Sequence, residues 1–199
     1  MTTPVYQFAD RAWMEFLELN PAWATVQGIE TWDDQLDDPS AEGRARLRAL
    51  IERWADEVET LSMSDLSVED TVTLGLMRAV ISRFRGADEL RLWEMEAMDQ
   101  YGGPQGLLGD LARMQRADTP ERFERLLARL EAYPGWMAAH RANLAEGVAA
   151  GRTAAPAVVE RCLTQTRRLV ETPAEQSPIV LVNSELDAEL HDRLVAAVE

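Results

Sequence analysis

The chain has 199 residues, 46% of them hydrophobic and 28% charged, which is the composition of a folded globular protein of one domain or one and a half. Its formal net charge of −15 repels phosphate backbones and anionic lipid headgroups, whereas proteins that bind nucleic acid present clustered basic side chains. The charge therefore argues against nucleic acids and membrane surfaces as partners.

A single cysteine, Cys162, excludes an internal disulfide and a zinc site built from several cysteines, and it fits a reducing compartment. Near the N-terminus, Asp10, Arg11 and Glu15 interrupt any apolar run that could act as a signal-peptide core. No segment approaches the roughly 18 uncharged apolar residues of a membrane-spanning helix. These features predict a cytoplasmic protein.

The first predicted helix follows Thr3-Pro4, where a capping hydroxyl precedes a proline at the first helical position. Phe8, Ala12, Phe16 and Leu19 recur at helical spacing until Asn20-Pro21 ends the pattern. A short helical turn from Pro21 to Gln27 is expected next, because Gly28 suits the left-handed position just past a helix end.

The stretch from Gly28 to Arg48 combines an acidic aromatic loop with a clear helix start. Asp33, Asp34, Asp37 and Asp38 lie among turn-forming residues without periodicity, and Ser40 is the expected N-cap of the next helix. One face of that helix carries the apolar residues Leu47, Leu50, Ile51, Trp54, Val58 and Leu61.

Ser67 to Asp70 resembles a capping box, and the apolar stripe of the helix it opens continues to Gly86. Beyond it, Leu90, Leu92 and Trp93 alternate with charged residues, which fits either a short extended stretch or an irregular helix. The sequence Tyr101-Gly-Gly-Pro104 breaks whatever precedes it.

The remaining helices are predicted from prolines and caps. Pro104, Pro156 and the Thr119-Pro120 pair each open a helix, while Pro134 is expected to force a kink or a new start. Pro173 and Pro178 mark a loop, and Ser184 is expected to cap a last helix from Glu185 to about Val198. That helix carries no stop signal at Glu199, so we expect the chain to be continued by something.

Together these patterns predict an all-α protein: a multi-helix bundle of about seven to nine helices with antiparallel neighbours. With no repeat and no linker rich in glycine or serine, residues 1–199 are treated as a single α-helical unit.

Complete catalytic or metal motifs are absent from the sequence. There is no HExxH, and the residue three before His191 is Ala188, so a di-iron Glu-x-x-His pair is missing as well. We interpret His140 and His191 as packed or capping residues. The four aspartates of the loop do not follow the alternating order of a calcium loop, and turn and helix-capping electrostatics explain them better.

Two further candidates have structural interpretations. Cys162 shares a helical face with Val158, Val159 and Leu163, which favours a buried structural thiol over a nucleophile. Tyr101 to Gly106 lacks the lysine and spacing of a phosphate-binding loop. No catalytic, cofactor-binding or metal residue is therefore predicted.

Three aromatic residues fall outside the clean helical stripes: Trp32, Trp93 and Tyr101. They are the candidates for a contact surface, although loop aromatics also commonly plug the end of a helical bundle.

The order of these features resembles a known family. The run PAWATVQGIETWDDQLDDPSAEGRARLRALIERWADEVETL is similar to the N-terminal signature of the bacterial domain-of-unknown-function family 885. Further support comes from the Gly102-Gly103 turn, from RFERLLARLEAYPGWMAAHRANLAEGVAAGRTAAP and from VVERCL. The signature positions are Ala24, Thr25, Gly28, Trp32, Asp33, Asp34, Leu36, Asp38 and Ser40.

Members of this family are similar to helical zinc metallopeptidases, are longer than this chain, and carry an HExxH metal site in their later part. The resemblance implies that these residues form the N-terminal, non-catalytic helical region, that the partner is the family's C-terminal catalytic half, and that zinc belongs only to that half. The alternative is a stand-alone helical protein-interaction module. An enzyme complete within these residues is a third possibility.

Overall fold

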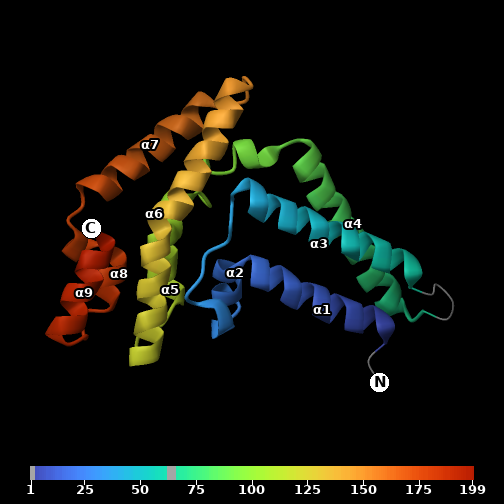
Figure 1. Ribbon diagram of the computed structural model, residues 1–199, viewed down its shortest axis with the longest axis horizontal. Helices are drawn as coiled ribbons and strands as arrows, with labels where there is room; N and C mark the ends of the chain where they lie inside the picture. The colour runs from blue at the N-terminus through green and yellow to red at the C-terminus, as the bar shows by residue number, and fades with distance from the viewer. Residues whose placement is uncertain (1–2, 62–65) are drawn as a thin grey trace. The chain divides into compact units, whose positions relative to one another are not determined.

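The computed structural model describes residues 3–61 and 66–199 (Figure 1). Within those residues it contains nine α-helices, four short 3-10 segments and no strand, which confirms the all-α prediction. Contacts divide the chain into two compact units. The first comprises Met1–Leu19 and Asp38–Trp93, and the second comprises Asn20–Asp37 and Glu94–Glu199.

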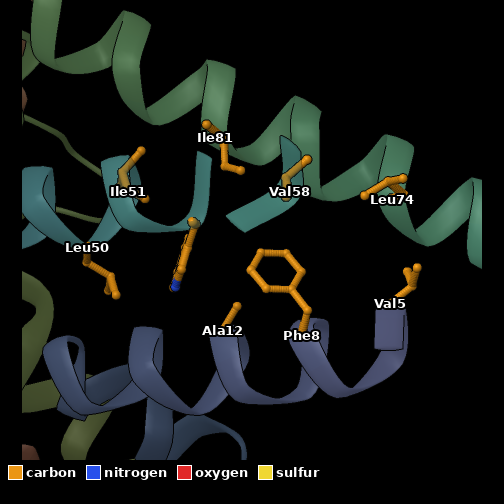
Figure 2. Packing of buried hydrophobic residues seen from close by; sticks show 9 residues of the cluster. Val5, Phe8, Ala12, Leu50, Ile51, Val58, Leu74 and Ile81 are labelled. Atoms are coloured by element: carbon orange, nitrogen blue, oxygen red, sulfur yellow. The ribbon is translucent and has the colours of Figure 1, made fainter. Parts of the chain in front are cut away.

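Three helices build the first unit: α1 (Pro4–Leu19), α3 (Ala41–Thr60) and α4 (Val68–Glu89). Their apolar faces meet in one core, where α1 lies opposite α4 and α3 completes the group (Figure 2). The buried members are Val5, Phe8, Ala12, Leu50, Ile51, Trp54, Val58, Leu74 and Ile81.

The predicted caps of these helices are confirmed. The Ser40 hydroxyl accepts from the Gly43 amide at 3.3 Å, so α3 begins where the sequence places it. At the start of α4, the Ser67 hydroxyl accepts from the Asp70 amide at 3.0 Å and the Asp70 carboxylate accepts from the Ser67 amide at 3.3 Å. This reciprocal pair is a capping box with aspartate in place of glutamate.

The second unit contains α2 (Pro21–Val26), α5 (Leu107–Met114), α6 (Pro120–Ala149), α7 (Pro156–Glu171), α8 (Pro178–Val182) and α9 (Ala188–Val198). Its core lies mainly between α5, α6, α8 and α9. The buried residues are Leu111, Ala117, Phe123, Leu126, Leu127, Leu130, Ile179, Val180 and Leu194.

The segment after α4 is helical in character. The helix runs through Gly86 to Glu89, and a 3-10 turn at Leu92–Glu94 follows Arg91, whose φ is 52°. Of the two alternatives for this segment, the irregular helix is therefore confirmed. Glu94 at its end is 1% exposed and forms an ion pair with Arg152.

Pro134 does not open a new helix. It lies inside α6, which continues from Pro120 to Ala149. A proline in a helix interior removes one backbone hydrogen bond, but the flanking turns keep theirs, and the buried residues Leu130 and Asn143 anchor α6 on both sides.

The C-terminal boundaries differ from the prediction. Pro178 opens the short helix α8 instead of marking a loop, and the Asn183 side chain donates to the Ile179 carbonyl at 2.7 Å where α8 ends. Asp187, and not Ser184, caps the last helix, since its carboxylate accepts from the Leu190 amide at 3.0 Å. Serine and aspartate are both suitable N-cap residues. Because the turn before α9 packs Leu186 against the core, the residue that follows it, Asp187, lies at the start of the helix.

Candidate functional site

The acidic aromatic loop in the second unit folds around one buried arginine. Gly28, with a φ of 75°, turns the chain out of α2, and the loop then passes through a 3-10 turn at Glu30–Trp32. Arg129, from the first half of α6, reaches this loop with a side chain that is 0% exposed.

The guanidinium of Arg129 donates four hydrogen bonds to the loop and its surroundings. Nε donates to the Gln35 carbonyl at 2.8 Å, and Nη2 donates to the Trp32 carbonyl at 2.7 Å. Nη1 donates both to the Thr25 hydroxyl at 2.9 Å and to the Gln115 side-chain carbonyl at 2.8 Å. The side chain therefore joins α2, the loop and the residue that follows α5.

Asp33 is the counter-ion of this arginine. It is 4% exposed, its Oδ1 lies 3.6 Å from Arg129 Nη2, and it accepts from the Thr25 hydroxyl at 2.5 Å. Gln115 adds a bond from its amide to the Asp33 carbonyl at 2.8 Å. The first aspartate of the loop thus belongs to a closed network of paired polar groups.

Burial lowers the pKa of Arg129 to about 10, although the carboxylates of Asp33 and Asp34 act in the opposite direction. The guanidinium remains charged at neutral pH. Because four of its N–H groups are directed at acceptors of the loop and its surroundings, this centre fixes the shape of the loop.

Sequence reasoning missed Arg129. The residue lies beside Leu126, Leu127 and Leu130 on the buried side of α6. An arginine within such an apolar stripe is the local sequence signal that could have indicated its burial. Its partners in α2 and the loop stand about a hundred positions earlier in the chain, and periodicity does not connect residues so far apart.

The three predicted contact aromatics have different surroundings. Trp32 is half-buried in the loop of the second unit, where its carbonyl accepts from Arg129. Trp93 belongs to the first unit, with Arg44 3.7 Å and Arg91 5.0 Å from the centre of its ring. Tyr101, in the second unit, is 86% exposed.

A shallow hollow of about 480 Å³ adjoins Tyr101. Its lining residues are Gln100, Tyr101, Glu160, Arg161, Thr164 and Gln165. Gln165 donates to the Gln100 carbonyl at 2.9 Å and Arg161 donates to the Gln100 side chain at 3.0 Å, so the loop is tied to α7 beneath the tyrosine.

The histidines do not provide a zinc ligand set. His140 packs edge-on against Trp136, with ring centres 4.4 Å apart, and burial lowers the pKa of its imidazole. His191 Nδ1 lies 3.9 Å from an oxygen of its neighbour Asp192. Within residues 3–61 and 66–199, no group of three histidine, cysteine or acidic side chains is placed to hold a metal ion.

Cys162 lies on α7 and is 4% exposed. Burial raises the pKa of its thiol, and the Gln105 amide lies 3.8 Å from the sulfur. This environment favours the neutral thiol, as expected for a structural residue.

Fold and site together define an all-α protein whose most elaborate polar centre shapes a loop. The chain belongs to the family described as "Bacterial protein of unknown function (DUF885)", which it matches over residues 21–199. No curated protein matches the chain.

Two solved structures share the fold. A putative lipoprotein from Colwellia psychrerythraea is 15% identical, with a TM-score of 0.77 over 100% of this chain and 39% of its own length. A putative lipoprotein of unknown function from Shewanella oneidensis is 16% identical, with a TM-score of 0.68 over 98% of this chain and 37% of its own. The chain spans about two fifths of the length of these structures.

Proposed function

We propose that this chain is the N-terminal, non-catalytic helical region of a zinc-dependent peptidase-like protein, with the role of walling the active-site cleft and packing against the catalytic helices. The observation that carries the proposal is the small share of each solved structure that this chain matches. The similar fold takes up the whole of this chain but only 39% of the Colwellia protein. A region of that kind contributes shape and stability to a larger architecture.

The residues present do not fit a zinc centre, because neither histidine has two further ligands beside it among the described residues. We therefore assign the expected HExxH motif and its zinc to residues outside this sequence. In this proposal, the network around Arg129 gives the loop from Gly28 to Asp37 a fixed shape, as a wall element requires.

We also propose a cytoplasmic location, supported by the single cysteine, whose thiol is buried. Among the residues that the structure describes, no helix has the length and apolar character needed to cross a membrane. The two structural neighbours are described as putative lipoproteins, so fractionation of cells is the appropriate test. Recovery of the native protein with the membrane pellet would overturn this location.

A stand-alone interaction module is the second candidate function. It is favoured by large apolar side chains that remain exposed along α4, such as Val68 at 78% and Leu76 at 62%. Under this alternative, the chain is a stable monomer that captures an unrelated protein.

Reading the gene beyond Glu199 tests the leading proposal first. We expect the frame, or a neighbouring one, to continue into a helical segment with HExxH. A stop codon directly after Glu199, with no neighbouring frame encoding that motif, would contradict the proposal and favour the module.

A further inference from the structure

The outer face of α4 is apolar along most of its length. Four large aliphatic side chains recur every four residues on this face, and a fifth follows after the helix end. We call them the α4 stripe: Val68, Val72, Leu76, Val80 and Leu90, which are 78%, 56%, 62%, 37% and 66% exposed.

The stripe lies opposite the residues that α4 contributes to the core. At about 100° per residue, Leu76 is on the other side of the helix from Leu74 and Ile81, which are 1% and 5% exposed and point toward α1 and α3 (Figure 2). The helix is therefore apolar on two opposite sides. Helices of that kind are typically covered on both sides.

Small residues between the stripe residues would let a second helix approach closely. Gly75, Ala79 and Gly86 lie on the same side of α4, and a Cβ built at either glycine would meet no atom within 4 Å. Arg83 is the one charged side chain near the middle of this face. An apolar ridge next to small residues is the surface into which the side chains of another helix pack.

Single exposed aliphatic residues are ordinary on protein surfaces, but a continuous apolar row marks an interface. The other helices of the first unit, α1 and α3, do not cover the row, since each of its members is more than a third exposed. The solved structures indicate which part of the protein covers it. In each, the fold of this chain takes up about two fifths of the polypeptide, and about three fifths of its length lies outside the match.

We propose that the α4 stripe is the docking surface for an apolar helix from the C-terminal part of the family architecture. This inference rests on the proposed function and adds to it the surface through which the N-terminal region holds its partner. Burial of the stripe removes apolar area from water, which is the main favourable term in such packing. The small residues set a close helix-to-helix distance.

Thiol labelling tests the docking surface. Leu76→Cys places a reactive group in the stripe, and Arg78→Cys places one at an exposed position about 160° further round α4, while the native Cys162 is buried. Each variant is prepared as residues 1–199 and as the polypeptide extended by its own coding sequence, or mixed with the product of the neighbouring frame. Alkylation of each cysteine is followed by peptide mass spectrometry.

We expect position 76 to be alkylated at least about tenfold more slowly in the extended protein than in residues 1–199, with the rate at position 78 unchanged. If position 76 is alkylated at the same rate in both proteins and the extended protein binds zinc, the docking surface is wrong while the proposed function stands. Absence of any continuation overturns both. If position 76 of residues 1–199 is alkylated slowly at high protein concentration and quickly after dilution, a second copy of the chain covers the stripe. That result would contradict the inference.

Discussion

The two units of the molecule are stabilised in different ways. In the first unit, α1, α3 and α4 share an aliphatic and aromatic core, and the ion pairs stay at the surface, as in the bond from Arg48 Nε to Asp88 at 2.7 Å. In the second unit, a loop without regular structure folds around the fully buried Arg129. The first arrangement follows from periodicity, whereas the second depends on contacts between distant parts of the chain.

The largest expected effect is that of removing the buried arginine. Arg129→Met leaves the Asp33 charge uncompensated and removes the partners of Thr25, Gln115 and two carbonyls, so we expect a loss of about 3–5 kcal/mol in the free energy of unfolding. Urea unfolding measures it. Adding Asp33→Asn should recover part of the loss, because the unpaired charge is removed.

The matched control lies one turn earlier on α6. Arg125 also donates to the loop, to the Glu30 carbonyl at 2.6 Å, but its side chain is 34% exposed. Arg125→Met should cost no more than about 1 kcal/mol. Equal losses for the two variants would mean that burial of the arginine does not stabilise the second unit.

A core truncation in the first unit should have a comparable or slightly smaller effect. Leu74→Ala removes buried methyl groups between α4 and the helices it contacts, at an expected cost of about 3 kcal/mol. Leu76→Ala, two residues away in the stripe, should change the stability of residues 1–199 by no more than about 0.5 kcal/mol. A large effect of Leu76→Ala in this polypeptide would show that the stripe is already covered.

The capping box of α4 should contribute less. Ser67→Ala removes the acceptor of the Asp70 amide, with an expected cost of about 1 kcal/mol. Ser82→Ala, an exposed serine in the middle of the same helix, is the control and should be close to neutral. Equal melting temperatures for Ser67→Ala and Ser82→Ala would mean that the cap does not stabilise α4.

The smallest expected effect is that of a surface ion pair between α3 and α4. Hydrogen bonding from Arg48 lowers the pKa of Asp88, so the pair stabilises the fold above the unfolded pKa of about 4, and that contribution is lost as the pH falls through the folded pKa. Arg48→Met should cost at most about 1 kcal/mol at pH 7. The difference from the native chain should vanish near pH 2, and a difference that persists there would not be electrostatic.

Helix starts could be predicted from sequence because they depend on neighbouring residues. Ser40, Ser67 and the Thr119-Pro120 pair each supply a side-chain acceptor within three residues of the amide that they cap. The core residues of α3 and α4 follow from helical spacing for the same reason.

The remaining features depend on tertiary context. The continuation of α6 past Pro134 and the choice of Asp187 over Ser184 are decided by packing that the local sequence does not specify. The loop contains a 3-10 turn at Glu30–Trp32, in line with its turn-forming residues, but the burial of Asp33 and its pairing with Arg129 of α6 were missed. Trp32, Trp93 and Tyr101 remain a predicted contact surface.

The treatment of the chain as one helical unit also remains a prediction. The chain passes between the two compact units three times, after Leu19, Asp37 and Trp93. Because the segment from Asn20 to Asp37 is joined at both ends to the first unit, we expect one cooperative unfolding transition. Urea curves for Leu74→Ala and Arg129→Met should then shift the same midpoint, and two separable transitions would contradict this expectation.

The most direct test of the central claim is the zinc content of purified residues 1–199 after incubation with zinc and dialysis. We expect no stoichiometric metal in residues 1–199, and zinc in the protein extended to include the expected HExxH segment. One zinc ion bound per chain of residues 1–199 would contradict the assignment of this chain as a non-catalytic region.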